Sequence, residues 1–370
     1  MTYSLTQPSA AKSRAAAATS GCATVGISRR AVLFGALASS ISAEAAYYPP
    51  PDSRGGWRRL EAAAEIRKAA GLNPEGLDRA FEYAKTTTKH GGLLVVRRGT
   101  LVYERYFGRG NPEATPALAS CGKSFTSVSV GILLQEQRAR FPKGLDQEVY
   151  TREYLPEEAF PLTDSRKARI RLGQLLAMSG GIRGNNPGYV HGKEVTLDPP
   201  GPDGWIASLD SMAFGKEDGP RNTISLWCEP GGGYSYATSS IHLASVVLRK
   251  AAGIELQEYV AGRLAEPLGW GRWGWGYRER LNAHTPGGGG IAPRPRDMLR
   301  FAYLLLRRGR WGERQLIPAD YVDHCGRRSP YNPHYPYSLQ FDVNEDGHAA
   351  GAPRDAFWKT GSGGHAFYVV

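Results

Sequence analysis

The sequence predicts an α+β fold: an antiparallel sheet, flanked by helices near the ends of the chain, with a large inserted helical region. Short β-rich runs at 93–96 and 101–107 are close enough in sequence to form a hairpin. Strand-like runs return only near the end, at 335–343 and 356–370. Between them, most of 117–310 carries apolar residues at spacings of three and four, which is the helical period.

Two helices are expected before the hairpin, over 57–72 and 73–88, because both stretches are rich in helix formers and Asn73-Pro74 breaks between them. We expect two lobes. The sheet lobe would be built from about 57–116 and 331–370, and the helical lobe from about 117–330. The stretch 183–222 is rich in Gly, Pro and Asp, and we expect it to be a long excursion that shapes a pocket.

The composition is that of a globular protein, with 41% hydrophobic and 22% charged residues among 370. Part of the net charge of +11 lies in the first 45 residues, and the rest is spread along the chain. No motif for entering a nucleic-acid groove accompanies this charge, so we expect a basic surface and no nucleic-acid partner.

Residues 1–45 have the three parts of an export signal. Ser28-Arg29-Arg30 precedes a short apolar run, and small residues follow up to Ala45. Paired arginines directly before the apolar run are typical of a bacterial twin-arginine signal. The run at 31–41 is too short to remain as a membrane anchor. We expect a periplasmic or extracellular protein without an integral membrane segment; an organelle transit peptide is the alternative.

Cleavage near Ala45 would leave three cysteines, Cys121, Cys228 and Cys325. Three thiols allow at most one disulfide, and buried free thiols are the simpler expectation. No Cys/His spacing typical of a metal site occurs, so neither a metal nor a cofactor is expected.

The stretch ALASCGKSFTS at 117–127 fits two catalytic motifs. A phosphate-binding loop would use Gly122-Lys123-Ser124, but Ala117 stands where that loop needs its first glycine. A Pro/Gly-containing linker also precedes the stretch instead of a buried strand. In the Ser-x-x-Lys motif, Ser120 and Lys123 lie one helical turn apart on one face. A buried amine at Lys123 could then take the proton of the Ser120 hydroxyl.

Two further motifs follow in order: Tyr236 in EPGGGYSYATSS, and Lys359-Thr360-Gly361 at the start of a β-like run. With these three motifs the chain resembles the class C β-lactamase-like serine hydrolases of the serine β-lactamase and penicillin-binding-protein superfamily. The resemblance spans roughly 90–370 and implies the β-lactamase/transpeptidase-like form of the predicted fold.

The resemblance implies a role for each matching position. Ser120 would be the nucleophile, Lys123 its proton acceptor, and Tyr236 the phenol that relays a proton to the leaving group. Lys359 would supply positive charge that favours the tyrosinate and attracts anionic substrates.

The backbone N–H groups of Ser120 and Ser362 would form the oxyanion hole, and two such fixed donors suit acyl transfer. The positions implied to contact substrate are Thr238, Thr360 and Gly361. Thr238 departs from the family, which usually has Asn there. The chain also stops at Val370, inside the strand of the third motif, where family members usually continue, so we expect the sequence to be truncated at its C-terminal end.

The expected function is that of an exported serine hydrolase that opens an amide or ester through an acyl-enzyme on Ser120. Four substrate classes remain open: β-lactams, D-amino-acid peptides, carboxylic esters and aminohexanoate oligomers. The charge of Lys359 favours a carboxylate-bearing amide. Oligomeric state is also open.

Two rival functions would use parts of the same sequence. An α/β-hydrolase would need a Gly-x-Ser-x-Gly turn, but the stretch around Ser179 has Ala177 in place of the first glycine and follows an apparent helix. The second rival keeps the same site without turnover: a non-catalytic or very slow binder of cell-wall peptide or β-lactam-like ligands.

Overall fold

The computed structural model describes residues 47–162, 164–197, 226–276 and 284–370. The predicted export signal, and residues 198–222 of the predicted excursion, lie outside these ranges. The described residues belong to one compact unit, Ala46–Val370. None of the helices in the described ranges combines the length and the hydropathy needed to cross a bilayer.

The α-helices along the described chain are α1 Ala63–Glu65, α2 Pro74–Thr87, α3 Gly122–Glu136, α4 Leu172–Leu176, α6 Thr238–Ala252, α7 Leu256–Val260, α8 Glu266–Leu268, α10 Pro295–Leu306 and α11 Ala319–Cys325. The strands are β1 Gly91–Arg97, β2 Thr100–Phe107, β3 Gly188–Val190, β4 Lys193–Val195, β5 Arg310–Trp311, β6 Arg314–Gln315, β7 Asp342–Val343, β8 Phe357–Gly361 and β9 His365–Val369. Two π-helical stretches, η2 Ile66–Ala70 and η7 Ala261–Ala265, continue α1 and precede α8.

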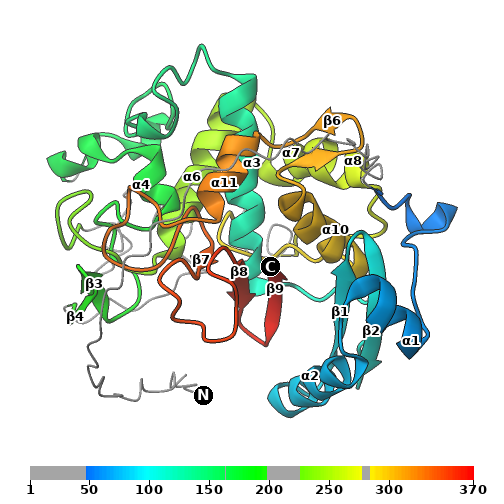
Figure 1. Ribbon diagram of the computed structural model, residues 1–370. Helices are drawn as coiled ribbons and strands as arrows, with labels where there is room; N and C mark the ends of the chain where they lie inside the picture. The colour runs from blue at the N-terminus through cyan, green and yellow to red at the C-terminus, as the bar shows by residue number, and fades with distance from the viewer. Residues whose placement is uncertain (1–46, 163, 198–225, 277–283) are drawn as a thin grey trace, which may run out of the picture. The chain divides into compact units, whose positions relative to one another are not determined.

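Antiparallel pairing confirms the predicted α+β fold class. β1 and β2 form the expected hairpin, and β7, β8 and β9 form a three-stranded sheet in which Lys359 pairs with Phe367. Helix α10 contacts both β1 and β9, while α2 packs against β1 and β2 (Figure 1). Residues from both ends of the described chain therefore share one helix as a support.

The predicted helix over 57–72 is wrong in its first half. Residues 58–60 run beside β2, where Leu60 N–H donates to the Leu101 carbonyl and Leu101 N–H donates to Arg58. Helical structure begins only at α1, and Gly71 ends η2 in a left-handed conformation, with φ at 68°. Pairing with the hairpin thus overrides the local helix propensity of this stretch.

Helix α3 is the central element of the core. Its side chains are buried from Gly122 to Leu133, and it packs against α6 and α7. Two of its small polar side chains bind the loop that leads to β7. Ser124 Oγ donates to the Gln340 carbonyl at 3.0 Å, and Ser127 Oγ donates to the Leu339 carbonyl at 2.8 Å. The segment 337–342 is thereby fixed against the helix that begins beside Ser120.

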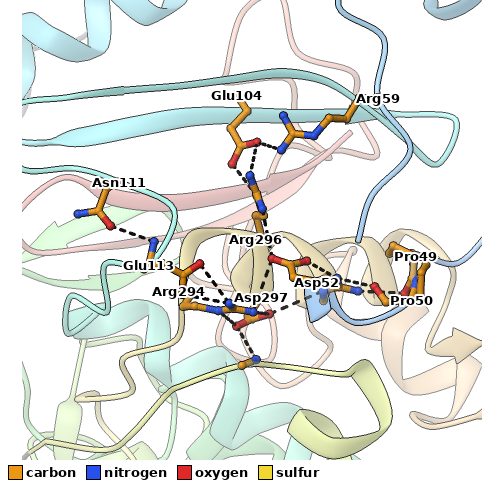
Figure 2. A network of polar contacts seen from close by, with 12 residues as sticks. Pro49, Pro50, Asp52, Arg59, Glu104, Asn111, Glu113, Arg294, Arg296 and Asp297 are labelled. Carbon is orange, nitrogen blue, oxygen red and sulfur yellow. Dashed lines mark hydrogen bonds and ion pairs between the residues drawn. The ribbon is translucent and has the colours of Figure 1, made fainter. Parts of the chain in front are cut away.

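A network of arginines and carboxylates connects the start of α10 to the N-terminal segment and to β2 (Figure 2). Arg300, fully buried, donates to the Pro49 carbonyl at 3.0 Å and to Asp52 Oδ1 at 2.7 Å. Arg296 bridges Glu104 on β2 at 2.7 Å and Asp52 Oδ2 at 3.4 Å. Burial would raise the pKa of Asp52, but these guanidinium groups hold it below its ordinary value.

Replacement of Asp52 by alanine should lower the free energy of unfolding by about 3 kcal/mol, because it leaves buried guanidinium charge without its carboxylate. Because the pKa of Asp52 is lowered in the folded protein, its contribution to stability is present at neutral pH and is lost as the pH falls below about 4. Urea unfolding measures both effects. Glu75→Gln is the control, since the pair of Glu75 with Arg67 is exposed to solvent and should contribute little to stability. Equal losses in the two variants would contradict this account.

Candidate active site

Ser120 and Lys123 meet at the start of α3. Ser120 lies in a short 3₁₀ turn, Ala119–Cys121, whose first residue is left-handed with φ at 47°. The turn leads directly into α3, so Lys123 stands one turn further on the same face. Lys123 Nζ lies 2.9 Å from Ser120 Oγ and donates to the Gly288 carbonyl at 2.7 Å. The amine therefore has the serine hydroxyl within hydrogen-bond reach.

Lys123 is 2% exposed. Burial lowers its pKa below the ordinary lysine value, and the positive charge of Lys359 lowers it further, although Tyr236 opposes both. A lysine with a lowered pKa is neutral over a wider pH range and has a lone pair that can accept a proton. The arrangement is that of a base next to a weak nucleophile.

Tyr236 stands two residues before the start of α6 at Thr238. Lys123 Nζ and Lys359 Nζ lie 5.2 and 4.8 Å from the centre of its ring. Burial by itself would raise the pKa of Tyr236, but the charges of the two lysines and a hydrogen bond with Ser120 bring it below its ordinary value. Tyr236 can therefore release its proton more easily than an exposed tyrosine, and its ionised form is populated closer to neutral pH.

Lys359, on β8, is also 2% exposed. It donates to the Tyr337 hydroxyl at 2.7 Å and forms an ion pair with Asp342 Oδ2 at 3.9 Å. Burial would lower the pKa of Lys359, but Tyr236 and Asp342 raise it above the ordinary value. The two buried lysines of the site thus have opposite protonation tendencies, one towards the neutral amine and one towards the ammonium.

A second tyrosine, Tyr337, lies beside both Lys359 and Tyr236, with its ring centre 4.6 Å from Lys359 Nζ and 6.2 Å from the ring centre of Tyr236. Its hydroxyl accepts from Lys359 and donates to Gln340 Oε1 at 3.0 Å, while Gln340 Nε2 donates to the Leu176 carbonyl at 2.7 Å. Along this chain of hydrogen bonds, each group therefore has a defined role as donor or acceptor. Burial raises the pKa of Tyr337 well above the ordinary value, so Tyr236 is the one of these two tyrosines that ionises more readily.

The end of β8 lies against the turn that carries Ser120. A β-carbon on Gly361 would lie 2.3 Å from the Leu118 carbonyl and 3.2 Å from the backbone nitrogen of Ser120, so only glycine fits there. Ser362 follows at once, in the turn between β8 and β9. The backbone segments that carry the two expected oxyanion donors therefore lie close to each other, and the glycine at 361 places no side chain between them.

Of the residues implied to contact substrate, Thr238 is half-buried at the first position of α6, and Thr360 is exposed. A β-carbon on Gly288 would lie 2.4 Å from Thr238 Cγ2, so the threonine methyl packs directly against the segment whose carbonyl accepts from Lys123. In this position the methyl group of Thr238 packs against Gly288, whose carbonyl accepts the hydrogen bond from Lys123.

The sequence did not single out three residues that the structure brings to the site: Gly288, Tyr337 and Asp342. The run of four glycines at 287–290 and the tyrosine-rich run before β7 were visible signals. Neither has a spacing that links it to Ser120, so only the fold shows that they meet.

The residues of the rival interpretations occupy structural positions. Ser124, which a phosphate loop would use, is fully buried and bound to Gln340. Ser179 is equally buried, and its hydroxyl donates to the Tyr331 carbonyl at 2.5 Å.

Burial raises the pKa of Cys121 to about 12, so its thiol stays protonated near neutral pH. The three cysteines of the described residues are free, and Cys121 and Cys325 are buried.

The helices and antiparallel strands described above have the arrangement of a β-lactamase-like fold. The family model Beta-lactamase matches residues 77–370, and the chain belongs to this family. No curated protein matches the chain.

Three solved structures show the same fold at low sequence identity. A putative β-lactamase from Bacteroides dorei is 18% identical, with a TM-score of 0.60 over 80% of this chain and 86% of that one. A putative 6-aminohexanoate-dimer hydrolase from Bacillus anthracis is 20% identical, with a TM-score of 0.60 over 87% and 80%. EstCE1, a hydrolase with promiscuous acyltransferase activity, is 16% identical, with a TM-score of 0.59 over 80% and 89%.

Proposed function

We propose that this protein is an exported serine hydrolase that cleaves an amide or ester bond through an acyl-enzyme on Ser120. The observation that carries the proposal is the 2.9 Å approach of Lys123 Nζ to Ser120 Oγ in a buried site. Membership of the Beta-lactamase family supports it, as does the similarity in fold to a putative 6-aminohexanoate-dimer hydrolase and to EstCE1, a hydrolase with promiscuous acyltransferase activity.

In the first step Ser120 Oγ attacks the substrate carbonyl carbon. Its proton passes to Lys123 Nζ, whose lowered pKa leaves a lone pair for it. The carbonyl oxygen takes up the negative charge and is held by the N–H groups of Ser120 and Ser362. Each such donor is worth a factor of about 100 to 1,000 in rate.

In the second step the tetrahedral intermediate collapses. The bond to the leaving group breaks, and the proton taken from Ser120 reaches that leaving group through Tyr236. Water then attacks the acyl carbon and gives a proton to the same pair of bases. The ester bond to Ser120 Oγ breaks, that proton returns to Ser120 Oγ, and the acid leaves. The ammonium of Lys359 beside Tyr236 favours the ionised form of Tyr236 between these proton transfers.

The test is a panel of chromogenic esters, nitrocefin and D-alanyl amides on the wild type and on Ser120→Ala. Hydrolysis of at least one compound by the wild type, with a loss of about 1,000-fold or more in kcat in the variant, supports the proposal. Ser362→Ala is the matched control, because only its backbone N–H is assigned a role. A wild type that binds these compounds without turnover would identify a binding protein and overturn the proposal.

A further inference from the structure

We propose that Asp342 is a specificity-determining residue that turns this site away from anionic acyl groups, so that its substrates are uncharged amides or esters. This inference rests on the proposed function and names the substrate class within it. The charge of Lys359 alone would favour the opposite, a carboxylate-bearing substrate.

The first support is that the Lys359 ammonium already has partners within the fold. Its Nζ donates to the Tyr337 hydroxyl at 2.7 Å, lies 4.8 Å from the centre of the Tyr236 ring, and forms an ion pair with Asp342 Oδ2 at 3.9 Å. A substrate carboxylate would therefore compete with these partners for a side chain that is only 2% exposed.

The second support is the position of Asp342 itself. Its side chain is 27% exposed, so it is the more open member of the pair with Lys359. Asp342 lies opposite Trp358 on β8, one residue from Lys359, and is fixed there by the pairing of β7 with β8. The carboxylate is therefore the more exposed group of the pair, and a ligand that contacts the buried ammonium comes close to the carboxylate as well.

The third support is the sum of charges around Tyr236. Asp342 pairs with Lys359 and offsets part of its charge, and burial lowers the pKa of Lys123, so the positive charge that the described site offers to an anion is reduced. A like charge placed in a partly buried site penalises the wrong substrate more than it weakens the right one. Uncharged acyl groups do not pay this penalty.

The experiment compares two esters that differ in one charge, p-nitrophenyl methyl glutarate and p-nitrophenyl hydrogen glutarate. The measured quantity is the ratio of kcat/KM for the anionic ester to that for the neutral one, at about pH 8, well above the ordinary pKa of a carboxyl group. In the wild type the neutral ester should be preferred. In Asp342→Asn the ratio should rise about tenfold or more, mainly through a lower KM for the anionic ester.

Glu345→Gln is the matched control, because it removes the same charge from an exposed residue three positions away. Its ratio should equal that of the wild type. Tyr337→Phe is a second variant that frees one donor of Lys359 without touching Asp342, and it should shift the ratio in the same direction. An unchanged ratio in folded Asp342→Asn, with the neutral ester still hydrolysed, overturns this inference alone. Absence of hydrolysis in the wild type contradicts the proposed function instead.

Discussion

Lys123→Met should lower kcat by about 1,000-fold or more while the protein stays folded, because the variant keeps the shape of the side chain and loses the amine that lies 2.9 Å from Ser120 Oγ. The free energy of unfolding should stay the same or rise, since a buried amine is replaced by an apolar chain. Lys123→Arg should be equally inactive, because a guanidinium does not release its proton.

The pH dependence of the wild type gives the same assignment a second test. The base must be neutral to accept a proton, and burial lowers the pKa of Lys123. The value of kcat/KM should therefore rise with pH through a pKa below the ordinary lysine value. Lys143→Met is the control, since this lysine is exposed on a loop and its replacement should change neither rate nor profile. Activity that survives in Lys123→Met would remove this residue from the mechanism.

Tyr236→Phe should lower kcat by about 100-fold or more, because the phenol that carries the proton to the leaving group is lost while the ring remains. The variant should also move the acid limb of the kcat/KM profile to lower pH. Tyr236 raises the pKa of Lys123 through its negative charge, so removing the hydroxyl lets burial lower that pKa further. The limb belongs to the coupled pair, and both members shape it.

Tyr337→Phe is the comparison for this variant, because Tyr337 lies equally close to Lys359 but stays protonated. Its kcat for a neutral ester should fall by no more than about tenfold, and its acid limb should stay in place. If both tyrosine variants lost activity equally and shifted the profile equally, the assignment of the proton relay to Tyr236 would be wrong.

The fold class was predictable from local patterns, since the hairpin at β1 and β2 and the late strands at β8 and β9 have clear signals in the sequence. The stretch at 57–72 was not, because its helix formers compete with hydrogen bonds to Leu101 that no local pattern shows. Tertiary pairing decided that segment.

The site divides in the same way. Ser120 and Lys123 could be placed together because three residues of helix fix their distance. Tyr236 and Lys359 needed the family resemblance, and the structure brings both to Ser120. Asp342 is far from all of them in sequence except Lys359, and its contact depends on the register of β7 against β8. Register is not readable from a two-residue strand.

The role of Ser120 as the carrier of the acyl group can be tested by the mass of the protein after reaction with a fluorophosphonate, followed by peptide mapping. We expect one adduct, on the peptide that contains Ser120, formed rapidly by the wild type, slowly by Lys123→Met and not at all by Ser120→Ala. An adduct on another serine, or one that persists in Ser120→Ala, would contradict it.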